Sequence, residues 1–77
     1  MTTVQLHLTF DDALELERTV AALRTSFPVH LDIRRANVEE PTAWFIVDLT
    51  GTADDIERAV GWLLDRGVIV DRIPIDG

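Results

Sequence analysis

Two segments of this chain repeat one another, and this repetition constrains the fold more than any other feature of the sequence. The segment 17–23, ERTVAAL, matches the segment 57–63, ERAVGWL, at an offset of 40 residues. An alternating apolar stretch that ends at Phe10 matches one that ends at Leu49, at an offset of 39 residues. Alternation predicts a strand, and apolar residues at spacings of three and four predict an amphipathic helix. Each copy is therefore expected to form a strand followed by a helix.

Capping and turn residues predict where these elements end. Asp12 and Thr52 each precede an acidic residue by three positions, a pattern that is typical of helix starts. Pro28 ends the first helix, and Gly67 is the expected C-terminal cap of the second. We expect strands at 4–10, 29–34, 43–50 and 68–73, helices at 13–26 and between Thr52 and Gly67, and a hairpin connection at 37–42.

The predicted elements follow the order strand, helix, strand, strand, helix, strand. Two strand-helix-strand units with right-handed crossovers interleave into one antiparallel sheet. The predicted fold is therefore an α+β, ferredoxin-like βαββαβ sandwich, with strand order 4-1-3-2 and both helices on one face of the sheet. Seventy-seven residues leave no room for a second core, so we expect a single domain that spans residues 1–77.

The small size of the domain favours association with another chain. A chain of this length buries only about 60% of the surface that its unfolded form exposes. The sequence contains no cysteine, which excludes disulfides and thiolate metal sites as sources of stability. We therefore expect a partner chain to supply additional stability, and we favour a homodimer joined face to face or edge to edge.

Charge and hydropathy exclude two classes of partner. Fourteen carboxylates oppose seven arginines, which makes the formal net charge −7. Such a chain repels the phosphates of nucleic acids and anionic lipid surfaces. No apolar run of the sequence, including 67–70, is long enough to cross a bilayer, and the first residues do not resemble a signal peptide. We expect a cytoplasmic protein that neither binds nucleic acid nor inserts into a membrane.

Catalytic chemistry is weakly supported by the sequence. Cysteine and lysine nucleophiles are absent, and we find no phosphate-binding loop and no hydrolase motif. His7 and His30 fall on strands that the third strand separates, so they are expected about 10 Å apart. A single zinc ion could not bind both within one chain, although two chains could share a metal. We expect no enzymatic activity, no cofactor and no metal site.

The sheet face that points away from the helices carries more apolar side chains than solvent contact requires. Its four large apolar residues are Trp44, Ile46, Ile69 and Ile73. Among polar neighbours they suggest a contact surface, and we predict that they form the interface with a partner. The alternative is that they are scattered surface residues, which occur on any small protein.

Arg34 and Arg35 form the one concentrated positive feature of this acidic chain. The planar guanidinium of arginine suits recognition of a carboxylate or another anion. The alternative is that these arginines neutralise Asp32, Glu39 or a carboxylate on a facing strand.

Several segments together resemble the NIL domain family. They are residues 27–40 (FPVHLDIRRANVEE), 44–51 (WFIVDLTG), 56–63 (IERAVGWL) and 67–70 (GVIV). The family takes its name from an Asn-Ile-Leu triplet at the second strand, where this chain has Asp32, Ile33 and Arg34. The similarity covers nearly the whole chain, and it rests on the order and spacing of these segments more than on any single motif.

The resemblance implies a ferredoxin-like fold, dimerisation and a role in sensing an amino acid. NIL domains typically occur at the C-terminus of the ATPase subunit of bacterial methionine importers. There a pair of them binds methionine at their shared interface and restrains transport. Others are fused to ferredoxin-type iron–sulfur domains, and this chain resembles a free-standing member. On this basis Asp32, Arg34, Asn37 and Trp44 are the expected ligand-binding residues.

Two functional hypotheses follow from the sequence. The first is a regulatory module that binds methionine or a related sulfur amino acid at a homodimer interface. The second is a module that docks onto an enzyme of sulfur amino acid metabolism without any small ligand.

Overall fold

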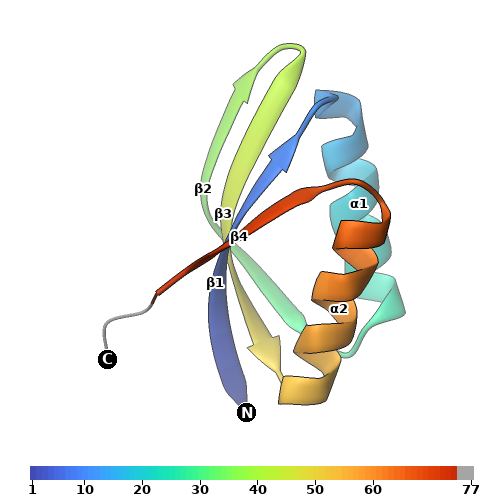
Figure 1. The fold of residues 1–77 in the computed structure, drawn as a ribbon, viewed down its shortest axis with the longest axis vertical. Helices are drawn as coiled ribbons and strands as arrows, with labels where there is room; N and C mark the ends of the chain where they lie inside the picture. Colours follow the sequence, from blue (N-terminus) through green and yellow to red (C-terminus); the bar gives the residue numbers. More distant parts are fainter. Residues whose placement is uncertain (75–77) are drawn as a thin grey trace.

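A computed structural model describes residues 1–74, and the last three residues of the predicted domain lie outside the described part. The strands are β1 (Thr2–Phe10), β2 (His30–Glu39), β3 (Thr42–Gly51) and β4 (Ile69–Ile73), and the helices are α1 (Ala13–Ser26) and α2 (Ala53–Asp65). The four strands form one antiparallel sheet in the order β2-β3-β1-β4, and both helices lie on the same side of it (Figure 1). The predicted ferredoxin-like βαββαβ fold and its strand order are confirmed.

The hydrophobic core lies between the sheet and the two helices. Along β1 and β3 every second side chain is buried, as the alternation predicted. The buried apolar side chains come from all six elements or their ends: Leu6, Leu8, Phe10, Leu16, Val20, Leu23, Leu31, Ala43, Phe45, Val47, Leu49, Ile56, Ala59, Val60, Leu63 and Val68. The opposite face of the sheet is therefore left without a covering layer (Figure 1).

The ends of the helices follow from local hydrogen bonds. A carboxylate oxygen of Asp12 accepts from the Leu14 backbone N–H at 2.9 Å, so Asp12 is the N-cap of α1. The Thr52 hydroxyl accepts from the Asp55 backbone N–H at 3.1 Å at the start of α2. Beyond α2, Gly67 has a φ of 85°, a left-handed conformation that glycine adopts without steric cost. The predicted starts of both helices and the predicted glycine cap are confirmed.

The second strand differs from the prediction in its length. It was expected to end at Arg34, but β2 continues to Glu39, and only Glu40 and Pro41 connect it to β3. The register between β2 and β3 shifts by one residue between Ile33 and Arg35. This β-bulge breaks the alternation, and the pattern resumes beyond it in the opposite phase. The predicted hairpin is present, but its connection is shorter than the expected 37–42, because Asn37–Glu39 pair with Thr42–Trp44 inside the sheet.

Candidate binding face of the sheet

The candidate site is the sheet face that the helices leave open. In the register of β1 with β3, Gln5 lies opposite Asp48, His7 opposite Ile46 and Thr9 opposite Trp44. These side chains are half-buried by one another, and they alternate with the core residues of the same strands. On β4 the same face carries Ile69, which is 53% exposed, and the half-buried Ile73. The structure thus brings the four predicted interface residues onto one face of the sheet.

An aromatic pair lies near the centre of this open face. The rings of His7 and Trp44 stack with centroids 5.1 Å apart and an interplanar angle of 23°. The Thr9 hydroxyl lies 3.4 Å from Nδ1 of His7 and can hold the imidazole in this orientation. Our sequence interpretation considered His7 only as a metal ligand and missed this contact. The signal for it was the strand register, since His7 is diagonal to Trp44 across the β1–β3 pair.

A cluster of charged side chains lies on the same face, toward the other end of β2 and β3. Asp32 and Asp48 are opposite one another in the register. Arg34 reaches both of them, with Nη1 at 3.3 Å from Asp32 and Nε at 3.6 Å from Asp48. Gln5 donates a further hydrogen bond to Asp48 at 3.1 Å. Of the two sequence interpretations of Arg34, pairing with nearby carboxylates is the one seen in the isolated chain, and the cluster keeps one excess negative charge.

The bulge in β2 adds a second arginine to the open face. Arg35 pairs with Ile46 and Asn37 pairs with Trp44, so both share the face of these β3 residues. Strict alternation from Ile33 would have placed Arg35 on the helix side. Within residues 1–74 Arg35 takes part in no ion pair. The structure therefore leaves one exposed guanidinium that sequence reasoning had not included among the ligand-binding residues.

The four predicted ligand-binding residues form two pairs rather than one compact group. Asp32 and Arg34 contact each other, and Asn37 lies opposite Trp44. The two pairs are separated along β3 by the four-residue interval from Trp44 to Asp48, which spans about 13 Å. Ile46 lies between them on the same face. Together they form an elongated strip that is charged at one end and aromatic at the other.

This strip is a surface and not a pocket within one chain. Four cavities described for residues 1–74 have other linings, and none of these four is lined by the predicted ligand-binding residues. Two of them lie at the N-terminal end of α1, one lies beside β4, and one lies between α1 and β2. A small ligand on the open face would thus remain largely exposed to solvent unless another molecule covered it.

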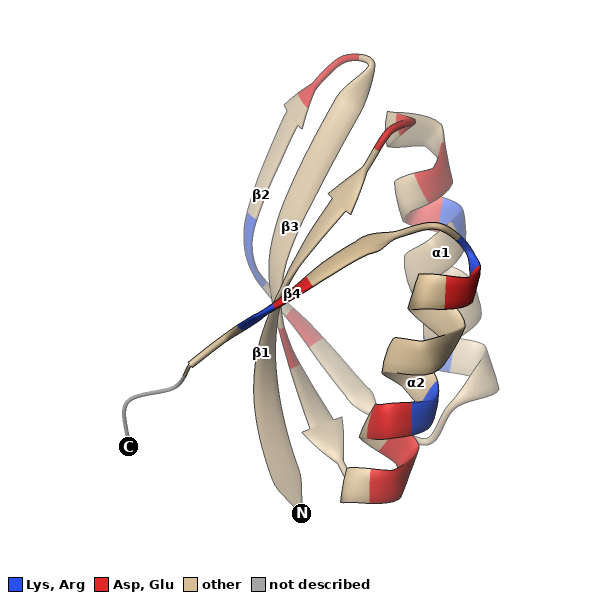
Figure 2. Cartoon of the chain, viewed as in Figure 1, with Lys and Arg blue, Asp and Glu red and all other residues tan. Residues whose placement is uncertain are grey.

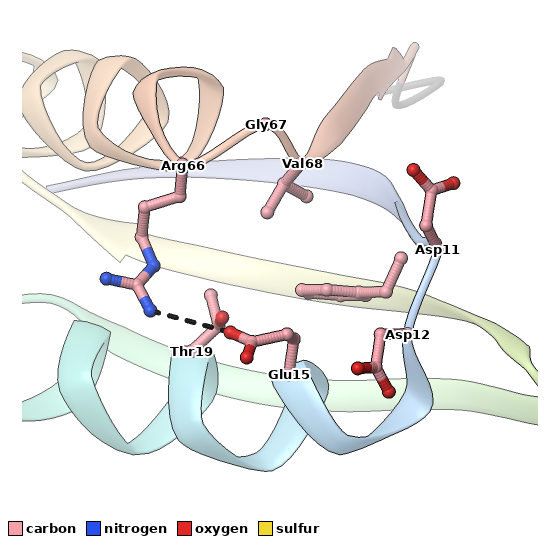
Figure 3. A pocket seen from close by; sticks show the side chains of 8 residues that line it. Asp11, Asp12, Glu15, Thr19, Arg66, Gly67 and Val68 are labelled. Atoms are coloured by element: carbon pink, nitrogen blue, oxygen red, sulfur yellow. Dashed lines mark ion pairs between the residues drawn. The ribbon is translucent and has the colours of Figure 1, made fainter.

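One of these cavities, of about 380 Å³, lies between the N-terminal end of α1 and the C-terminal end of α2 (Figure 3). Three of its four charged lining residues have structural roles. Asp12 caps α1, and Glu15 forms an ion pair of 3.9 Å with Arg66. Arg66 also lies over the Trp62 ring at 4.7 Å. These contacts hold the ends of the two helices together.

Across residues 1–74, no group of three or more histidine, cysteine or acidic residues is arranged to hold a metal ion. Neither described helix is long and apolar enough to cross a membrane.

Comparison with known proteins places the chain in a family. A search among curated proteins found no match. Among solved structures, the de novo designed protein Foldit4 has the same fold, with a TM-score of 0.59, 15% sequence identity, and coverage of 96% of this chain and 97% of the designed one. That likeness concerns the fold alone. The NIL domain model matches residues 4–72, and the chain is therefore a member of the NIL domain family of small regulatory and binding domains.

Proposed function

We propose that this NIL domain is a regulatory module that binds methionine or a related sulfur amino acid on its open sheet face, within a homodimer. The observation that carries the proposal is the strip itself, in which a cluster of two carboxylates and a guanidinium continues into an apolar and aromatic surface. A free amino acid with an apolar side chain has the same division into a zwitterionic end and an apolar end. NIL domains are regulatory modules rather than catalytic ones, which agrees with this proposal.

The charged end of the strip suits the zwitterion. Asp32 and Asp48 can accept hydrogen bonds from the ligand ammonium, and their excess negative charge favours a cation. Arg34 can turn its exposed guanidinium edge toward the ligand carboxylate, for which its planar donor geometry is suited. Charge-assisted hydrogen bonds of this kind are stronger than neutral ones. Asp32, which stands where the family has an asparagine, would thus bind the ammonium group of the ligand.

The apolar end of the strip suits the side chain. A side chain that starts at the Asp48 end runs over Ile46 toward the His7–Trp44 pair. A thioether makes favourable contacts with aromatic rings at about 5 Å. Asn37, half-buried opposite Trp44, borders the same end of the strip. This combination favours methionine over a charged or strongly polar amino acid.

A second copy of the chain next to the strip would cover more of the ligand. Small-molecule sites bury most of the ligand surface, whereas the open face offers no such pocket among the cavities described for residues 1–74. A domain of this size also gains stability from a partner. The proposal therefore assigns the ligand to the junction between two chains.

Isothermal titration with methionine, homocysteine and cysteine tests this function. We expect saturable binding of methionine to the parent protein, and we expect Asp32→Ala and Trp44→Ala each to weaken it at least about tenfold. Arg58→Gln is the matched control, because Arg58 lies on α2 and pairs with Asp55 at 2.6 Å, away from the open face. Absence of heat with every compound at millimolar concentration would refute the proposal.

A second candidate function is docking onto an enzyme of sulfur amino acid metabolism. It is supported by the exposure of Ile69, and none of the four cavities described for residues 1–74 is lined by the predicted ligand-binding residues, since a flat apolar surface suits a protein partner. Affinity capture with the parent and with Ile69→Asp distinguishes the two functions. A docking module loses its captured enzyme in the variant, whereas an amino acid sensor keeps its affinity for methionine.

A further inference from the structure

We propose that two copies of this chain join along β2, in an antiparallel pairing centred on Asn37, to form one continuous eight-stranded sheet. The inference deepens the proposed function, because it specifies the partner and its geometry. It begins from the sheet order, in which β2 is an edge strand with one side free of any neighbouring strand. An edge of this kind can add a strand from another chain through its backbone hydrogen bonds.

The charges along β2 are arranged so that the strand complements itself. Arg35 precedes Asn37 by two residues and Glu39 follows it by two, and all three share the open face because they pair with alternate residues of β3. Figure 2 shows the basic segment in the middle of β2 and the acidic segment at its hairpin end. In an antiparallel pair centred on Asn37, Arg35 of each chain lies opposite Glu39 of the other. Opposite charges at directly opposed positions stabilise a strand pair.

Other registers of the same edge lack this complementarity. Centring the pair on Arg35 would oppose two arginines, and centring it on Glu39 would oppose two glutamates, both of which are destabilising. Centring it on Ala36 or Val38 would place Arg35 and Glu39 opposite uncharged residues. A pair centred between two residues would turn the open face of one chain onto the helix side of the other. The bulge at Ile33–Arg35 limits the regular edge to Arg35–Glu39, the segment that carries the complementary charges.

The isolated chain leaves these charges without partners of opposite sign. Within residues 1–74 neither Arg35 nor Glu39 takes part in an ion pair, and the Glu39 carboxylate accepts a hydrogen bond from the neutral Asn37 amide at 3.3 Å. The two side chains lie four positions apart on one strand, about 13 Å, and so cannot reach each other within a chain. In contrast, Arg34 already contacts two carboxylates. The unpaired charges of β2 are thus available to a second copy.

Exposed apolar side chains border the same edge on the helix side. Val38 is 55% exposed and Ile33 is 40% exposed, although their partners on β3 are core residues. Leu14, 75% exposed on the first turn of α1, lines a cavity together with Glu40 and Pro41 at the hairpin end of β2. A second copy at this edge would cover these side chains and add apolar burial to the backbone hydrogen bonds.

The other sheet edge lacks this complementarity. An antiparallel pair centred on Asp71 of β4 would oppose two aspartates, and one centred on Arg72 would oppose two arginines. Pro74, which follows β4, has no backbone N–H to donate to a neighbouring strand. The pairing is therefore assigned to β2.

Charge reversal tests the pairing and its register. We expect the parent to be a dimer by sedimentation equilibrium without ligand, and R35E and E39R each to weaken the dimer by about tenfold or more, because every cross-chain pair then has like charges. The double variant R35E/E39R restores opposite charges and should dimerise like the parent. A 1:1 mixture of the two single variants should form a heterodimer, since one chain then has only acidic and the other only basic side chains at these two positions. Arg58→Glu on α2 is the control for the change in net charge.

A single-cysteine variant tests the axis of the dimer. Paired residues of antiparallel strands have Cα atoms about 4.5–5.5 Å apart, within the range of a disulfide. Asn37→Cys should therefore form a covalent dimer under mild oxidation, whereas Asp71→Cys on β4 should not. The inference would be overturned if the parent were monomeric at about 100 μM, a concentration at which weak dimers form. It would also be overturned if the single variants dimerised as tightly as the parent. Methionine binding by such a monomer would leave the ligand proposal standing, and a β2-linked dimer without methionine binding would refute only the ligand.

Discussion

Substitutions at two positions of β3 test the division between the core face and the open face. Leu49 is 1% exposed and Ile46 is half-buried on the opposite face. Leu49→Ala removes buried methyl groups and leaves a cavity, which costs about 2–5 kcal/mol in close-packed cores. A chain of 77 residues has a free energy of unfolding of about 4–12 kcal/mol, so this single change removes a large part of it.

Urea denaturation followed by circular dichroism measures this loss. With a slope near 1 kcal/mol per M for a small domain, the midpoint of Leu49→Ala should fall by about 2 M or more. Ile46→Ala is the matched comparison, and its free energy of unfolding should fall by less than about 1 kcal/mol, because that side chain is only partly buried and lies outside the core. Protein concentration is held equal in all samples, since a dimer would make stability depend on it. A loss below about 1 kcal/mol for Leu49→Ala, or an equal loss for both variants, would refute the assignment of the two faces.

Three further predictions concern individual contacts. Thr52→Ala removes the side-chain cap of α2, so the free energy of unfolding should fall by about 1 kcal/mol and the melting temperature by about 4–8 °C. Thr52→Ser keeps a capping hydroxyl and should retain most of the parent stability. Gly67→Ala should lower the free energy of unfolding by about 1–2 kcal/mol, since alanine resists a φ of 85°, and an unchanged denaturation midpoint would contradict the left-handed cap. In a Trp62→Phe background, His7→Ala should shift the emission of Trp44 to longer wavelength without unfolding the domain, because it uncovers the indole ring; an unchanged spectrum would argue against the stack.

Most of the fold could be predicted because its signals are local. The alternation in β1 and β3 follows from the two-residue period of a strand, and each strand needs only its own residues to show it. The helix starts at Asp12 and Thr52 are likewise local, since each cap bonds to a backbone N–H two or three residues further on. Repetition of the strand-helix unit then leaves few arrangements with right-handed connections.

The course of β2 could not be predicted in the same way. Its bulge is a property of the pair β2–β3, because it consists of one additional residue on one strand relative to the other. The apolar pattern resumes out of phase beyond Arg34, and a search for continuous alternation stops there. Our sequence interpretation therefore ended the strand early and missed the position of Arg35.

The sequence predicted the face on which most of the candidate residues lie, but not how they contact one another. Asp32, Arg34 and Trp44 lie on the open face, as expected from their strands. Asn37 was expected in the connection and joins this face because β2 continues to Glu39. That Arg34 contacts Asp48 depends on the approach of two strands, and the stacking of His7 on Trp44 depends on the register of β1 with β3.

By itself, the sequence determined the order of the elements, the helix ends and the choice of residues that face the core, since these depend on periodicity and on contacts within a few residues. Only the tertiary structure decided that Arg35 joins the open face, that the charges of Arg34 are already paired, and that the cavities described for residues 1–74 lie elsewhere than the predicted site. These features arise where strands distant in the chain meet, and the register between such strands is set by the packing of the whole sheet.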